Sequence, residues 1–290
     1  MLKYLAMLAM FLDHIGVYFY PLLPPPLYMG LRLVGRLAMP IFVYYLVLGL
    51  GRSRSIFRYL LRLFVWACVT ELGLRLLQWQ GLMGQEPPNV LFNLAATLLF
   101  LIAVEFLRHA WPDVLGGMRR VAAFGPGPDL PRDYQLRLSL YGLTLPRRFA
   151  VLFALLALLL SLALIGWLRP DYGYMLLGLA LCYYLADEER DKELVGKSLG
   201  WPELRPYALM FLLSFLLFFL DYLRLRNLGA GPSALIQIFG AFAVWLFPLA
   251  QLSGKRRPGN WERLACYAFY PLHKVLLILL AALSMGSVLR

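Results

Sequence analysis

Long apolar stretches recur along the whole chain and are separated by shorter polar segments. The apolar runs are about 18 to 22 residues long, which is enough for an α-helix to cross a hydrocarbon core of about 30 Å. Runs of this length are too long and too numerous for the buried core helices of a soluble domain. The pattern predicts an all-α protein, a polytopic integral membrane helical bundle with about nine transmembrane helices.

Apolar spans joined by polar segments follow one another from the N-terminus to the C-terminus, and no stretch has the composition of a separate soluble domain. We expect a single transmembrane domain over residues 1–290, with the longest polar segment, residues 108–148, as a basic cytoplasmic loop within it. Alternating residues 134–141 in that loop resemble a β-strand or an interfacial segment. The predicted spans cover residues 4–22, 29–50, 57–77, 90–107, 149–168, 171–186, 207–225, 233–252 and 264–288.

Composition supports lipid as the main solvent of the chain. Hydrophobic residues make up 61% and charged residues only 15%, whereas soluble domains carry about 25% charged residues. The net charge is +12, but the basic residues lie in short loops between apolar runs, so we expect the lipid bilayer and no nucleic acid as a partner. The three cysteines fall in apolar runs without metal-ligand spacing, so we expect no disulfide and no metal.

Charge asymmetry predicts the orientation of the spans, because Lys and Arg accumulate in cytoplasmic loops. The segment after the second span and residues 108–148 are basic, whereas residues 78–89 contain no Lys or Arg. With nine spans, this distribution places the N-terminus in the cytoplasm and the C-terminus outside.

Ionisable residues within the spans are costly, so they mark candidate sites. Asp13 and His14 lie near the middle of the first span, and Arg32 and Arg36 share one face of the second. The two spans are joined by a proline-rich turn, which would bring Asp13 and Arg36 to a similar depth. A carboxylate–guanidinium pair would leave the imidazole free for proton transfer near neutral pH. A structural ion pair beside a hydrogen-bonded histidine is the alternative.

A second intramembrane histidine, His273, lies near the middle of the last span and is followed by Lys274. One histidine on an apolar helix is usually a packed, hydrogen-bonded residue, but two at matching depth favour a functional site. Glu71 and Arg75, four residues apart in the third span, are expected to satisfy each other.

Several motifs together resemble the TraX family, which is named for the protein that acetylates the N-terminus of F-pilin. They include Asp-His in the first span and Tyr-Pro-Leu-His in the last. The first two spans more distantly resemble the transmembrane acyltransferase superfamily. The resemblance implies a multi-pass N-acetyltransferase of the bacterial inner membrane that uses acetyl-CoA. The segments that carry it are residues 2–16, 35–42, 89–92, 171–173 and 267–273.

We therefore expect transfer of an acetyl group from cytosolic acetyl-CoA to an amine at the membrane or its outer face. The acceptor would be a pilin or peptide N-terminus, or a small amine. Acyl transfer needs a base and positive charge near the developing oxyanion. We assign His14 as the base, oriented by Asp13, with Arg36 and His273 stabilising charge or positioning the thioester.

The remaining site residues fall into two groups. Four basic residues at the cytoplasmic side would suit the phosphates of CoA, although they serve equally well as a positive-inside anchor. These are Arg52, Arg54, Arg58 and Arg62. We also assign five substrate-binding positions, namely Arg32, Asn89, Asp171, Tyr172 and Tyr270.

Two other functions remain open from the sequence. A proton-coupled transporter or flippase would use Asp13, His14 and Arg36 as an intramembrane relay. A catalytically silent assembly partner would use the same cluster for packing. The choice between direct transfer and an acetyl-enzyme is also left open.

Overall fold

Helices form nearly all of the structure, a computed structural model that describes residues 2–53, 55–84, 86, 88–124, 137–140, 143–170, 172–193, 205–229, 232–249 and 259–288. A short antiparallel hairpin, β1 and β2, is the one sheet in this part of the chain. The elements are α1 (Leu2–Tyr18), η1 (Tyr20–Leu22), α2 (Pro25–Gly35), α3 (Ala38–Arg52), α4 (Ile56–Trp79), α5 (Val90–Phe124), β1 (Arg137–Leu140), β2 (Leu143–Pro146), α6 (Arg147–Leu168), α7 (Met175–Glu193), α8 (Arg205–Asn227), the 3₁₀ segment η4 (Pro232–Leu246) and α10 (Asn260–Val288).

The all-α membrane bundle predicted from the sequence is confirmed. Where the structure describes them, the predicted spans are largely helical, and 5 helical segments of this part of the chain are long and apolar enough to cross a membrane. Leucines on α6 and α8 are exposed in large numbers, which suits a surface in contact with lipid rather than water. The five segments are Pro25–Gly51, Val90–Trp111, Arg148–Leu168, Pro206–Asn227 and Leu264–Ser284.

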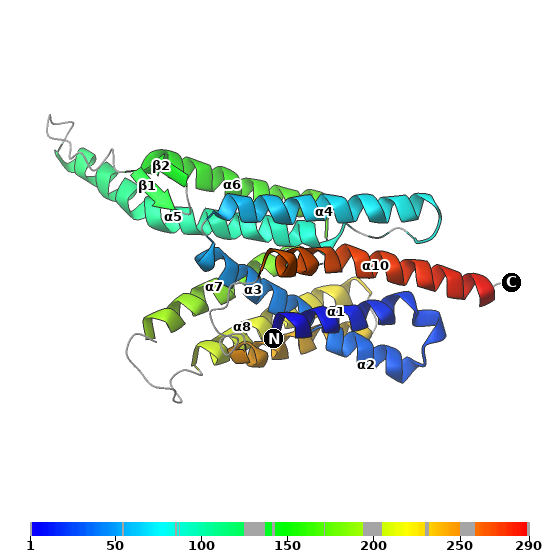
Figure 1. The fold of residues 1–290 in the computed structure, drawn as a ribbon. Helices are drawn as coiled ribbons and strands as arrows, with labels where there is room; N and C mark the ends of the chain where they lie inside the picture. Colours follow the sequence, from blue (N-terminus) through cyan, green and yellow to red (C-terminus); the bar gives the residue numbers. More distant parts are fainter. Residues whose placement is uncertain are drawn as a thin grey trace.

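The helices run roughly along one common direction in two groups (Figure 1). Helices α4, α5 and α6 pack side by side in one group, while α1, α2, α3, α7 and α8 form the other. Helix α10 contacts both α4 and α1, and so links the two groups. The core of the second group contains a stack of aromatic rings in which Tyr44 and Phe247 have centroids 4.0 Å apart.

The second span was expected as one helix, but it breaks into α2 and α3 at Arg36 and Leu37. Pro40 accounts for the break, because it has no N–H to donate to the carbonyl of Arg36 four residues earlier. The Arg36 carbonyl instead lies close to Gly240 of η4, only 3.1 Å from the position of an added Cβ. The break therefore places Arg36 where α2, α3 and η4 meet.

Helix α5 corrects the expected boundary of the long polar segment. The fourth span was expected to end at residue 107, but the helix continues to Phe124. Hydropathy detects only the portion suited to lipid, whereas backbone hydrogen bonds can continue a helix into water. Further along, β1 (Arg137–Leu140) confirms the strand expected within residues 134–141.

Candidate active site

Helices α1 and α10 lie side by side and run in the same direction. At their starts, Lys3 Nζ lies 2.6 Å from Glu262 Oε1. Eleven residues further along each helix, His14 Nδ1 lies 2.6 Å from His273 Nε2. Equal separations along both helices mean that the two histidines share one depth, about 16 Å from the Lys3–Glu262 pair. The depth match predicted from the sequence is confirmed.

Hydrogen bonding determines which nitrogen carries each proton in this pair. His273 Nδ1 lies 2.6 Å from the carbonyl oxygen of Phe269, which can only accept, so Nδ1 must donate. When both rings are neutral, His273 Nε2 is then an acceptor and His14 Nδ1 is the donor to it. The lone pair of His14 is left on Nε2, to which no described residue hydrogen-bonds. His273 therefore fixes the tautomer and orientation in which His14 can act as a base.

Asp13 points toward α2 and binds arginines of the second span. Its Oδ1 lies 2.8 Å from Arg32 Nη1 and 3.7 Å from Arg36 Nη2. Arg36 also donates from Nη1 to Gln237 Oε1 of η4 over 3.0 Å. The predicted pairing of Asp13 with Arg36 is confirmed, but Arg32 is the closer partner.

The expectation that Asp13 orients His14 is wrong. Neighbouring residues on an α-helix point about 100° apart, so Asp13 faces α2 while His14 faces α10. The hydrogen-bonding partner of the His14 ring is His273. Asp13 instead neutralises part of the charge of two arginines beside the histidine pair.

A cavity of about 630 Å³ connects these groups. Along α1 it extends from Lys3 to Tyr18, which is about 22 Å of helix. Near the Lys3 end its walls are mainly apolar or aromatic and include Met7, Met10 and Tyr59. Around and beyond His14 the walls become polar. The volume lies in the range of small-molecule and cofactor sites.

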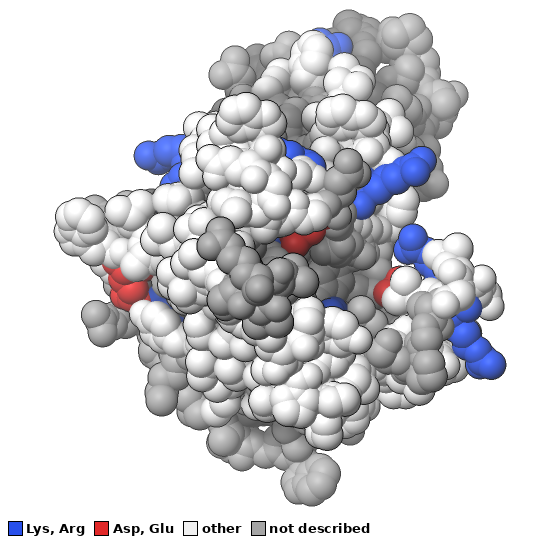
Figure 2. Space-filling model, turned by 90° about the vertical axis from the view of Figure 1, so that its right-hand side faces the viewer, with Lys and Arg blue, Asp and Glu red and all other residues white. Residues whose placement is uncertain are grey.

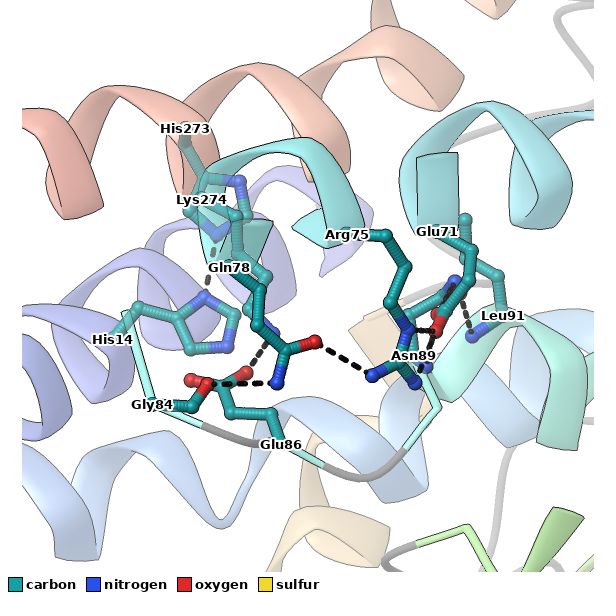
Figure 3. A network of polar contacts seen from close by, with 10 residues as sticks. All are labelled: His14, Glu71, Arg75, Gln78, Gly84, Glu86, Asn89, Leu91, His273 and Lys274. Carbon is teal, nitrogen blue, oxygen red and sulfur yellow. Dashed lines mark hydrogen bonds and ion pairs between the residues drawn. The ribbon is translucent and has the colours of Figure 1, made fainter. Parts of the chain in front are cut away.

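A second polar pair, separate from the histidine pair, lies toward the far end of the cavity (Figure 3). Lys274 Nζ lies 2.9 Å from Glu86 Oε2, and Glu86 belongs to the connection between α4 and α5. We call this the Glu86 end of the cavity. Figure 2 looks onto this end of the molecule and shows acidic and basic atoms beside a hollow in a mostly uncharged face.

The proposed substrate-binding residues separate into three groups. Arg32, Tyr172 and Tyr270 line the cavity. Asn89 is buried outside the cavity wall, where its Nδ2 donates to the Ala67 carbonyl and to Glu71, so this assignment is corrected to a helix-packing role. Asp171 lies outside the described residues.

The arginines expected to bind CoA lie outside the cavity wall where they are described. Arg58 and Arg62 are exposed one turn apart on α4, and Arg62 Nε donates to the Arg58 carbonyl. Their neighbours Tyr59 and Leu63 line the cavity. Arg54 and the side chain of Arg52 lie outside what the structure describes.

Other polar residues of the third span form the ion pair that was predicted. Arg75 Nη2 lies 2.7 Å from Glu71 Oε1, four residues earlier on α4. Glu71 also accepts from Asn89, which ties the start of α5 to α4. These contacts hold the two ends of the α4–α5 connection, from which Glu86 projects (Figure 3).

Sequence reasoning did not assign several polar residues of the cavity wall to the site, among them Lys274, Glu86, Gln237 and Asp221. Glu86 is the one acidic residue in a connection without Lys or Arg. An acidic residue with no basic neighbour in its own connection could have indicated a partner elsewhere in the chain. Gln237 and Asp221 lie in apolar runs, where polar side chains are costly. Within the described residues, no group of three or more His, Cys, Asp or Glu could hold a metal ion.

Comparison with known families decides the classification of the chain. The family model described as TraX protein matches residues 1–188. The chain belongs to the TraX family. TraX membership fits a membrane protein that modifies pilin. The match includes His14 and Arg36, while His273 lies beyond it. No curated protein and no solved structure matches the chain.

Proposed function

We propose that this TraX family protein is an acetyl-CoA-dependent N-acetyltransferase of the bacterial inner membrane. It would move the acetyl group from cytosolic acetyl-CoA to an amine at the membrane or its outer face, such as a pilin or peptide N-terminus. The observation that carries the proposal is the His14–His273 pair. It leaves a basic nitrogen on His14 in a cavity that also contains two arginines.

The reaction that these groups support is a direct attack of the amine on the thioester. The amine nitrogen forms a bond to the carbonyl carbon while His14 Nε2 takes a proton from the nitrogen. The carbon–sulfur bond then breaks, and the CoA thiolate leaves and recovers that proton from His14. The products are the acetylated amine and CoA, and His14 returns to its starting form.

Arg36 supplies positive charge close to the developing oxyanion. It is buried, with 9% of its surface exposed, and its guanidinium is held by both Asp13 and Gln237. A donor that is already oriented needs no reorganisation when the oxyanion forms, which makes it more effective than water. Arg32 adds a second guanidinium at the same carboxylate.

The donor would enter from the Lys3 end. The cavity there is mainly apolar, which suits the acyl chain of a thioester better than a hydrated ion. Arg58 and Arg62 lie beside cavity-lining residues of α4 and would receive the charged phosphates of CoA outside the lipid. The acceptor would enter from the Glu86 end.

An acetylation assay tests the proposal. Purified protein in detergent is mixed with labelled acetyl-CoA and glycinamide, a small primary amine, and CoA release and labelled product are measured. We expect His14→Gln to lower kcat at least about 100-fold, the usual contribution of a positioned base. His109→Gln is the matched control, because His109 is 43% exposed and its ring bonds the Glu105 carbonyl. Turnover by His14→Gln at the wild-type rate would remove His14 from the mechanism.

The transporter alternative is tested with the same protein in liposomes. Counterflow of glycinamide without acetyl-CoA, together with no acetylated product, would favour transport. Acetylation that requires both substrates would favour the enzyme.

A further inference from the structure

The cavity already holds a primary amine of the protein itself. Lys274 directly follows His273 on α10 and is only 7% exposed. Its ammonium group lies 2.9 Å from the Glu86 carboxylate, and both residues line the cavity that contains His14. Figure 3 shows the Lys274 side chain running past His14 toward Glu86. A carboxylate at this end of the cavity is therefore placed to hold a primary ammonium group.

Among the described residues, three carboxylates line the cavity, and Glu86 differs from the other two. Asp13 is held by two arginines. Asp221 lies on α8, 3.7 Å from Arg224 three residues later. Glu86 is paired with a lysine, whose flexible stem and single point of charge make it easier to displace than a guanidinium. Its side chain is also 30% exposed, so an incoming molecule can reach it.

We propose that Glu86 binds the ammonium group of the acceptor, and that Lys274 occupies this site while no acceptor is bound. This inference rests on the proposed function and names the acceptor class as a protonated primary amine. The incoming ammonium replaces Lys274 Nζ at Glu86, and Lys274 moves aside on its flexible stem. Neutral acceptors such as alcohols and amides are not recognised by this site.

The location fits the proton transfer that acetylation requires. The His14 ring lies 5.9 Å from the Tyr18 ring, and Lys274 Nζ lies 6.0 Å from the centre of the same Tyr18 ring. The ammonium site and the proposed base thus border one aromatic side chain. An amine arrives protonated at neutral pH, so it first releases one proton to water at the exposed Glu86 end, and His14 then takes the second proton as the nitrogen attacks the thioester carbon.

If Lys274 and the acceptor compete for Glu86, substitutions of Glu86 and of Lys274 should shift the KM for glycinamide in opposite directions. Glu86→Gln removes the carboxylate and should raise the KM for glycinamide about tenfold or more, because a hydrogen bond to a charged group is lost. Lys274→Met removes the competing amine at similar length and should lower that KM several-fold. If the pair only holds the α4–α5 connection in place, both substitutions should weaken binding.

The experiment measures glycinamide KM and, without acetyl-CoA, glycinamide binding by calorimetry, with neutral acetamide as the control ligand. Glu105→Gln is the matched protein control, because it removes a buried carboxylate that lies outside the cavity wall and should change the glycinamide KM less than twofold. The acetyl-CoA KM should stay unchanged in all variants. Opposite shifts for Glu86→Gln and Lys274→Met support the proposal. Loss of binding in both, or equal binding of acetamide, overturns it.

Breaking a buried pair can prevent folding, since one charge is left alone. If Glu86→Gln does not fold, the double variant Glu86→Gln/Lys274→Met removes both charges and must bind glycinamide at least about tenfold more weakly than Lys274→Met alone. Equal affinity of these two proteins overturns the proposal. Binding with the expected pattern but no acetylation would keep the ammonium site and refute the acetyltransferase function. Acetylation without the expected binding pattern would keep the acetyltransferase function and refute the ammonium site.

Discussion

Individual charges around the cavity are held in pairs, and the histidine pair is the exception. Asp13 meets arginines, Glu86 meets Lys274, and Lys3 meets Glu262. Such pairing lowers the cost of placing charge within a membrane. His14 and His273 can instead form one hydrogen bond while both rings are neutral. At the scale of residues, the two histidines are thus suited to transfer a proton. The ion pairs are suited to keep the electrostatic field around that proton constant.

His273 should act through His14, and two substitutions can show this. His273→Gln keeps an oxygen that can accept from His14 Nδ1, whereas His273→Leu removes the acceptor at similar volume. We expect His273→Leu to lower kcat about 10-fold to 100-fold with little change in either KM, because a misoriented base affects the chemical step. His273→Gln should recover part of the loss in acetylation assays. Equal rates for both variants would contradict a positioning role.

At the scale of elements, a glycine and a proline allow α1 to approach the broken second span. A Cβ built on Gly35 would lie 2.3 Å from both Cβ and Oδ1 of Asp13, so only glycine permits this contact. Pro40 breaks the helix one turn later, which leaves Arg36 at the junction with η4. Backbone features thus determine the distances at which Asp13 and Arg36 meet.

Gly35→Ala should separate α1 from α2. The added methyl group would overlap the Asp13 side chain, and we expect a loss of about 1–3 kcal/mol in unfolding free energy, together with reduced acetylation. Thermal unfolding in detergent gives the first quantity and CoA release the second. Gly30→Ala is the matched control on the same helix, because its Cβ would have nothing within 4 Å. Equal unfolding free energies of the two variants would mean that α1 can move away from α2 without destabilising the protein.

At the scale of the whole molecule, the first and last helices combine to form the centre of the site. Lys3 and Glu262 join the starts of α1 and α10, which sets them parallel and brings His14 beside His273. The cavity extends along α1 from its Lys3 end to its Glu86 end. A donor and an acceptor arriving from opposite sides of a membrane could therefore meet within one cavity.

Cysteine labelling in cells would test the orientation that we propose. In a background lacking Cys68, Cys182 and Cys266, Gly84→Cys should react with a membrane-impermeant maleimide added outside the inner membrane. Gly51→Cys should react only after the membrane is opened. Both positions are exposed and have nothing within 4 Å of an added Cβ, so neither substitution should disturb packing. The reverse labelling would place the donor side outside and exclude cytosolic acetyl-CoA as proposed.

Removing charge from the Lys3 side should weaken donor binding. In Arg58→Gln/Arg62→Gln we expect the acetyl-CoA KM to rise while kcat changes little, since phosphate contacts bind substrate and transition state alike. The wild-type KM should also rise with salt more steeply than that of the variant. Arg224→Gln is the control, because Arg224 is 65% exposed in the last turn of α8. An unchanged donor KM would leave these arginines only a topological role.

Much of the architecture follows from the sequence because lipid imposes a simple rule. Each span must be apolar and must satisfy its own backbone, so hydropathy alone locates the helices. Intramembrane Asp13, His14 and His273 were likewise visible as costly exceptions. The boundaries of α5 and the break at Arg36 were not found, since they depend on water and on one proline rather than on average hydropathy.

Contacts between distant segments required the tertiary structure. The sequence by itself determined the membrane bundle, the equal depth of the two histidines and the Asp13–arginine pairing, because these follow from helix periodicity and length. Only the fold decided that His14 turns to His273 instead of Asp13, that Asn89 packs against α4, and that Glu86 reaches Lys274. Helix periodicity states which residues share a face, but only packing decides which neighbouring helix that face meets.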